Sequence, residues 1–148
     1  MRALIALGLF SCLTALACHS NSTTGPISNA TSLSGKWIYS AGNLSSVGGG
    51  ISCSVSGFTL TLVVSGTTLS GNYTGGNINC NGNNVTTQGG ALANGVISGS
   101  TVVFDLDSPD WHNVGSATTN SMSGNASVLL AVNGTEYQMT GAWIATRE

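Results

Sequence analysis

The sequence predicts an all-β domain over residues 34–148, folded as an antiparallel up-and-down barrel of about eight strands. Apolar residues alternate with Ser, Thr and Asn along most of this region, which is the period-two pattern of half-buried strands. Short runs rich in Gly, Asn and Ser separate the alternating stretches and are typical of turns. Closing such a meander into a barrel removes the exposed edges that an open sheet would leave.

The first half of the domain is expected to form strands at 36–40, 51–55, 58–64 and 69–73, with a turn at Ser56-Gly57 between the second and the third. The longest of them carries apolar residues at every second position from Phe58 to Val64, so one of its faces should point into the core. Residues 81–84, Asn-Gly-Asn-Asn, have the composition of a turn.

The second half continues in the same way, with strands expected at 91–97, 102–106, 122–132 and 137–145. The last two are joined by Asn-Gly at 133–134, the strongest short hairpin signal in the chain. An apolar residue followed by Ser or Thr and then Gly recurs at five of the expected strand starts. Glycine within a strand permits sharp coiling and leaves room for a neighbouring aromatic ring.

Charged residues are scarce, at 5% of the chain, with three Lys and Arg against five Asp and Glu. Such a surface does not attract phosphate backbones, which excludes nucleic-acid binding as a function. Cys53 and Cys80 are the two cysteines within the domain, and in an exported chain they are expected to form a structural disulfide. A metal site or a redox pair is the alternative, but neither a third ligand nor a CxxC spacing accompanies them.

The N-terminus has the pattern of an export signal. Met1-Arg2 precedes an apolar run that ends at Ala17, and the chain turns polar directly after Cys18, whereas a membrane span needs about 20 apolar residues. The segment Ala15-Leu16-Ala17-Cys18 resembles the lipobox of bacterial lipoproteins. The resemblance implies that residues 1–17 are removed, that Cys18 carries a lipid, and that the protein is anchored in the bacterial cell envelope.

Two alternatives remain for this segment. Cys12, preceded by Leu9-Phe10-Ser11, also fits a lipobox, but would leave an apolar start to the mature chain. An ordinary cleaved signal peptide with an incidental cysteine is the other. In the favoured interpretation, the Ser-, Thr- and Asn-rich residues 18–33 are a flexible tether.

Two short motifs resemble those of calycin-type barrels. Gly35-Lys36-Trp37 is similar to the Gly-x-Trp signature of lipocalins, and Arg147 lies where that family places an arginine over the tryptophan. The Leu-Ser-Gly-x-aromatic phrase, as in Leu69–Tyr73, is similar to avidins. The resemblance implies a barrel that binds a small apolar or amphipathic ligand without catalysis. Inward-facing aromatic residues would line the pocket, namely Trp37, Tyr73, Phe104 and Trp143, although an eight-stranded barrel can equally be filled by its own side chains.

Acidic residues gather with a histidine at one place, around Asp105, Asp107, Asp110 and His112. Oxygen ligands with an added imidazole could hold a cation such as calcium. The alternative is that Asp107 and Asp110 cap a turn while Asp105 is solvated on an outer face. Neither a GxSxG motif nor another recognisable Ser-His-Asp pattern is present, and no enzymatic activity is expected.

A second class of function is also open. Leu33 to Ile38, with one disulfide in a small barrel, is similar to periplasmic metalloprotease inhibitors, and a structural envelope lipoprotein is a further possibility. In a protein-binding module, Trp111 would be an exposed contact at the mouth of the barrel, because it follows Pro109 on an expected loop. The ligand-binding barrel is the favoured hypothesis.

Overall fold

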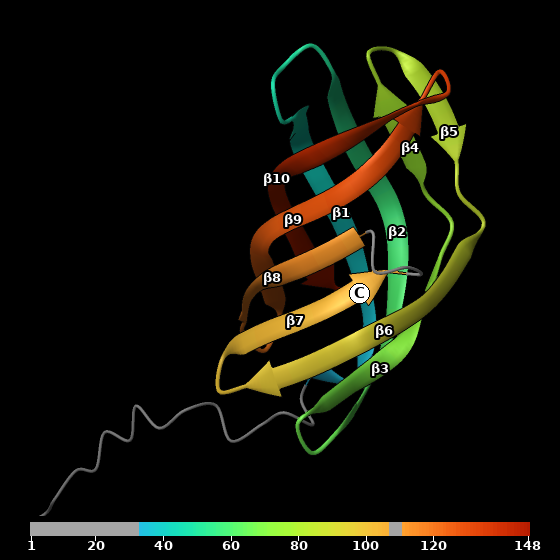
Figure 1. The fold of residues 1–148 in the computed structure, drawn as a ribbon. Coiled ribbons are helices and arrows are strands. Elements are labelled where there is room, and N and C mark those ends of the chain that lie inside the picture. Colours follow the sequence, from blue (N-terminus) through green and yellow to red (C-terminus); the bar gives the residue numbers. More distant parts are fainter. Residues whose placement is uncertain (1–32, 107–110) are drawn as a thin grey trace, which may run out of the picture.

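The computed structural model describes residues 33–106 and 111–148, and these form a closed antiparallel barrel (Figure 1). Its ten strands follow the chain in order: β1 (Gly35–Ser46), β2 (Ser52–Ser65), β3 (Thr68–Thr74), β4 (Asn77–Cys80), β5 (Asn83–Thr86), β6 (Gly89–Ser98), β7 (Thr101–Leu106), β8 (Trp111–Ala117), β9 (Ser121–Val132) and β10 (Thr135–Arg147). The expected signal peptide and most of the expected tether lie outside these residues. No helix in the described ranges is long and apolar enough to cross a membrane.

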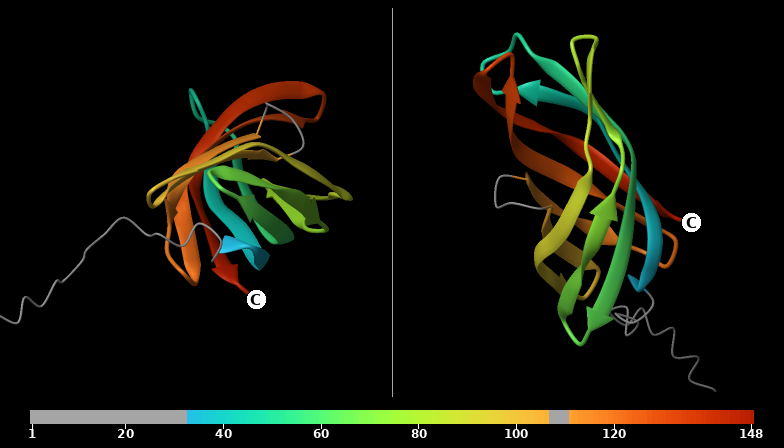
Figure 2. Two further views of the ribbon diagram at one scale, coloured as in Figure 1. Left: turned by 90° about the horizontal axis from the view of Figure 1, so that it is seen from below. Right: turned by 90° about the vertical axis from the view of Figure 1, so that its right-hand side faces the viewer.

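The ten strands make an eight-stranded up-and-down barrel, as predicted. β2 pairs with β3 over Thr59–Ser65 and with β4 over Cys53–Ser56, so β3 and β4 are two parts of one barrel strand. β5 and β6 continue each other in the same way, because β5 pairs with β4 and β6 with β3. β1 pairs with both β2 and β10, which closes the barrel (Figure 2).

Alternation of side chains places the apolar face of nearly every strand in one core, which includes the predicted inward residues Phe58, Leu60, Leu62 and Val64. Glycines make room for the largest of these side chains. Gly115 and Gly124 lie opposite each other on β8 and β9, and a Cβ atom at Gly115 would lie 2.7 Å from Trp143. Gly115 therefore leaves room for an aromatic ring, but it lies outside the recurring motif, and Cβ atoms at the motif glycines Gly71 and Gly124 would meet backbone atoms instead.

The end of the barrel that holds Leu33 and the C-terminal end of β10 is closed by side chains. Trp37 Nε1 donates a hydrogen bond to the Leu33 carbonyl (2.9 Å), and the Arg147 guanidinium lies 4.7 Å from the centre of the Trp37 ring. Arg147 also donates to the carbonyls of Ser34 and Thr119. The predicted packing of Arg147 over Trp37 is therefore confirmed, and Leu33, assigned to the tether from sequence, belongs to the core.

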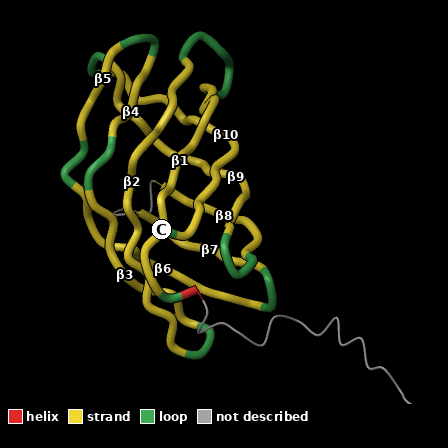
Figure 3. The backbone as a smooth tube through the Cα atoms, turned by 180° about the vertical axis from the view of Figure 1, so that it is seen from behind, coloured by secondary structure: helices red, strands yellow, loops and turns green. Residues whose placement is uncertain are grey.

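The opposite end, at the top of Figure 1, is uneven because the strands have different lengths. Pairing of β8 with β9 reaches Trp111 and Val128, while β9 continues to Val132. At the other edge of the sheet order, β5 has β4 as its one strand partner among the described residues. The β4–β5 and β9–β10 hairpins thus extend beyond β7 and β8 (Figure 3).

Candidate functional site

The interior of the barrel is occupied by a cluster of aromatic rings. Tyr39 stacks on Trp143 and Phe58, with ring centres 5.7 and 6.0 Å apart. Phe104 packs edge-on against Trp143 at 5.4 Å, and Tyr73 stacks on Phe58 at 5.3 Å. Stacked and edge-to-face rings at these distances are favourable beyond the area that they bury.

The four predicted ligand residues have different positions in this interior. Tyr73, Phe104 and Trp143 belong to the aromatic cluster, and Trp37 lies below it at the closed end. All four side chains are buried. They contact other core residues, so a role in ligand contact remains a prediction for them.

Trp111 is buried, and the expectation that it is exposed on a loop is wrong. It is the first residue of β8, is 8% exposed, and packs against Phe58 at 5.7 Å between ring centres. Its Nε1 donates to the hydroxyl of Tyr39 (3.3 Å). The strand begins immediately at Trp111, and alternation then directs its ring inward.

Tyr39 and Asn113 form a hydrogen-bonded polar group inside the apolar core. The Tyr39 hydroxyl donates to Asn113 Oδ1 (2.8 Å), and Asn113 Nδ2 donates to the carbonyls of Phe104 and Trp111. Burial raises the pKa of the Tyr39 phenol well above its ordinary value of 10.0, and the hydrogen bond from Trp111 opposes this only in part. Tyr39 is therefore a neutral donor in the folded protein.

This raised pKa predicts how stability depends on alkaline pH. Unfolding frees Tyr39 to ionise near pH 10, so its contribution to the free energy of unfolding is complete below that pH and declines as pH rises further. The wild type should lose more stability above pH 10 than Tyr39→Phe, measured by urea unfolding at several pH values. Equal slopes of stability against pH in the two proteins would contradict this prediction. So would a phenolate absorbance change in the native wild type that is larger than that of native Tyr39→Phe by one tyrosine, because Tyr39 would then ionise without unfolding.

Of the four candidate cation ligands, the structure describes Asp105 and His112, while Asp107 and Asp110 lie outside the described residues. Asp105 and His112 are directly opposite each other on β7 and β8, and His112 Nδ1 lies 2.6 Å from Asp105 Oδ1. Asn94 Nδ2 donates to the other carboxylate oxygen (2.7 Å). Asp105 is on the outer face as expected, but it is 5% exposed, so the expectation that water solvates it is wrong.

Among the described residues, neither a third metal ligand nor a hydrogen-bonded serine accompanies this pair. Within residues 33–106 and 111–148, no group of three His, Cys, Asp or Glu side chains could hold a metal ion. Ser127 is opposite His112 on β9, yet its hydroxyl accepts a hydrogen bond from Gln138 Nε2 (2.8 Å) and makes none with His112. A serine nucleophile needs contact with its base, and that contact is missing here.

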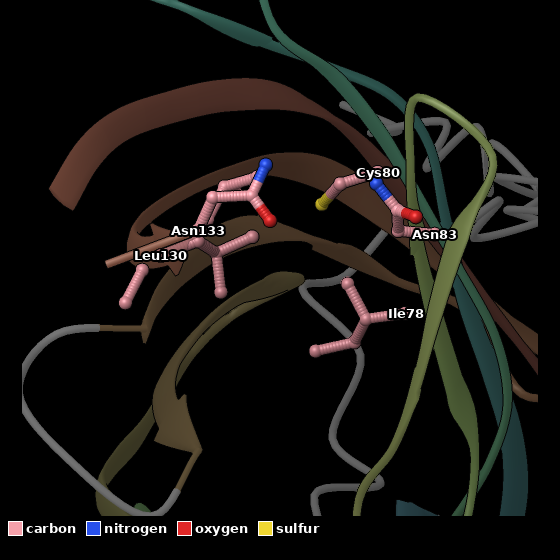
Figure 4. A pocket seen from close by; sticks show the side chains of 7 residues that line it. Ile78, Cys80, Asn83, Leu130 and Asn133 are labelled. Atoms are coloured by element: carbon pink, nitrogen blue, oxygen red, sulfur yellow. The ribbon is translucent and has the colours of Figure 1, made fainter. Parts of the chain in front are cut away.

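The predicted disulfide is confirmed, and it borders a pocket. Cys53 and Cys80 are bonded and lie opposite each other on β2 and β4. Cys80 is one wall of a cavity of about 180 Å³ between the β4–β5 and β9–β10 hairpins (Figure 4). The cavity is lined by Ile78, Cys80, Asn83, Leu130, Ala131, Val132 and Asn133.

Sequence reasoning missed this pocket. Leu130 and Val132 lie on the expected strand 122–132, Asn83 and Asn133 fall in expected turns, and Ile78 falls outside every expected strand. These five residues meet because the two hairpins extend beyond the shorter β7 and β8. How far each strand extends along the barrel cannot be predicted from a local sequence pattern. Comparison of the chain with family models, with curated proteins and with solved structures found no match.

Proposed function

We propose that this protein is an exported bacterial lipoprotein, anchored through Cys18, that binds a small apolar or amphipathic ligand without catalysis. The observation that supports ligand binding is the apolar pocket at the open end of the barrel. Its walls are Ile78, Leu130 and Val132 with the disulfide sulfur of Cys80. Concave, mostly apolar sites with a few polar groups are typical of small-molecule binding.

The closed barrel and its aromatic interior support the same proposal. Phe58 and Trp143 of the aromatic cluster lie on β2 and β10, and these strands continue to the two hairpins, because β2 pairs with β4 and β10 pairs with β9. A preformed site loses less entropy when its ligand binds. The calycin-like resemblance of the first strand points in the same direction. The competing protein-binding hypothesis placed one of its contacts at an exposed Trp111, and that side chain is buried.

Native mass spectrometry of the full chain, exported and processed by a bacterial host, tests the ligand. We expect a discrete extra mass that is released on denaturation and that identifies the ligand class. A protein of bare mass after gentle purification would contradict the ligand-binding proposal and favour a packed barrel that contacts other proteins.

The denatured mass of the same sample tests the anchor. We expect a chain that starts at Cys18 and carries lipid, and a loss of that lipid in the full-length Cys18→Ser variant. Cys12→Ser is the matched control, because Cys12 is the alternative lipidation site. Lipid that persists in Cys18→Ser and disappears in Cys12→Ser would assign the anchor to Cys12.

A further inference from the structure

The structure assigns an uncharged ligand to the pocket between the two hairpins, one with an apolar body of about one ring and one hydrogen-bonding group held by Asn83 and Asn133. This inference rests on the proposed function and specifies its ligand class. It concerns the hairpin pocket and not the aromatic residues of the barrel interior.

The size of the cavity limits the apolar body. A cavity of about 150 Å³ lined by aliphatic side chains accepts benzene, and the volume here is about 180 Å³. A single ring or a short branched chain therefore fills it. Ile78 on β4 and Leu130 on β9 face this volume from opposite walls (Figure 4), so the body of the ligand contacts both hairpins.

Among the residues that the structure describes, the lining of the pocket carries no charged side chain. A carboxylate or ammonium group placed there would lose its hydration and gain no counter-ion, which is far more costly than the loss for a neutral group. The closest charged position along β10 is Glu136, which is exposed and paired with Ala131. Alternation directs it away from the inner face that carries Leu130 and Val132.

Asn83 and Asn133 supply the polar recognition. Asn133 lies in the β9–β10 turn, and Asn83 is the first residue of β5, opposite Cys80. Both are exposed at the rim of the pocket. Neither side chain makes a hydrogen bond within the described residues, whereas neighbouring Asn84 and Asn79 bond to each other at 2.7 Å. A carboxamide both donates and accepts. The two therefore suit a hydroxyl, carbonyl or amide group at the outer end of a ligand whose body is buried.

Four probes share one benzene ring and differ in charge and in hydrogen-bonding group: toluene, benzyl alcohol, benzoate and benzylammonium. They therefore test separately whether the pocket needs an uncharged ligand and whether it binds a polar group. Ligand-observed NMR titrations would use the full chain, as processed by its host, in phosphatidylcholine nanodiscs, with empty nanodiscs as background. We expect benzyl alcohol to bind at least about tenfold more tightly than either ion. Equal affinity for the ions and the alcohol would overturn the inference and leave the proposed function standing.

Variants test the two asparagines. Asn83→Ala and Asn133→Gly should each weaken the binding of benzyl alcohol by about 2–10-fold, the range for one hydrogen bond. The affinity for toluene should stay within about twofold of the wild-type value. Glycine is chosen at Asn133 because φ is +52° there, and Asn84→Ala, on the outer face of β5, is the matched control. If the ratio of the affinities for benzyl alcohol and toluene is unchanged in both variants, the assignment of Asn83 and Asn133 as the polar contacts is wrong. If the wild type binds none of the four probes, both the ligand class inferred for this pocket and the proposed ligand-binding function are contradicted.

Discussion

Replacing Trp143 by alanine is expected to lower the free energy of unfolding by about 3–5 kcal/mol, the range for removal of a buried aromatic side chain. Trp143 is 1% exposed, and it packs against both Tyr39 and Phe104. Its Nε1 also donates to the Asn125 carbonyl (3.1 Å). Collapse into the vacated space is limited, because the glycine pair opposite it, Gly115 and Gly124, has no side chains to fill the gap.

The matched control is Ile144→Ala, one residue further along β10. Ile144 is 54% exposed on the outer face, so its truncation should change stability by no more than about 0.5 kcal/mol. Urea unfolding followed by far-ultraviolet circular dichroism measures both variants without relying on tryptophan fluorescence. Similar losses in the two variants would mean that the aromatic cluster is not the centre of the core.

Local patterns in the sequence were sufficient for the barrel itself. The period-two face from Phe58 to Val64 and the Asn133-Gly134 hairpin both have the predicted geometry. These features depend on neighbours two positions apart or on a single turn, so they are visible in one stretch of sequence. The disulfide followed from composition, because only Cys53 and Cys80 lie in the domain.

Features that depend on the register between strands could not be read in the same way. Asp105 contacts His112 because β7 and β8 align these two positions, and a shift of one residue would move the His112 side chain to the other face. Trp111 was misplaced for a related reason. Pro109 suggested a loop, while the position at which β8 begins is set by its pairing with Val128 on β9.

Removal of the disulfide is expected to have the second large effect, and it connects stability with the pocket. Cys53 and Cys80 are 27 residues apart, and closing a loop of this length stabilises a fold by about 3–4 kcal/mol on the chain-entropy model. The double variant Cys53→Ser/Cys80→Ser should lose roughly this amount in urea unfolding. Ser54→Ala is the control, since Ser54 is the next residue of the same ladder and is exposed.

The loss should be concentrated in the β4–β5 hairpin. Four residue pairs join β4 to β2, and β5 has no strand partner other than β4 in the described sheet. Hydrogen exchange should therefore accelerate over residues 77–86 well before the rest of the barrel opens, because the least-supported unit opens first. Since Ile78, Cys80 and Asn83 form one wall of the pocket, benzyl alcohol should also bind more weakly to the double variant under conditions where the barrel stays folded. Faster exchange spread evenly over all strands, with binding unchanged, would show that the disulfide stabilises the barrel as a whole and does not position the pocket.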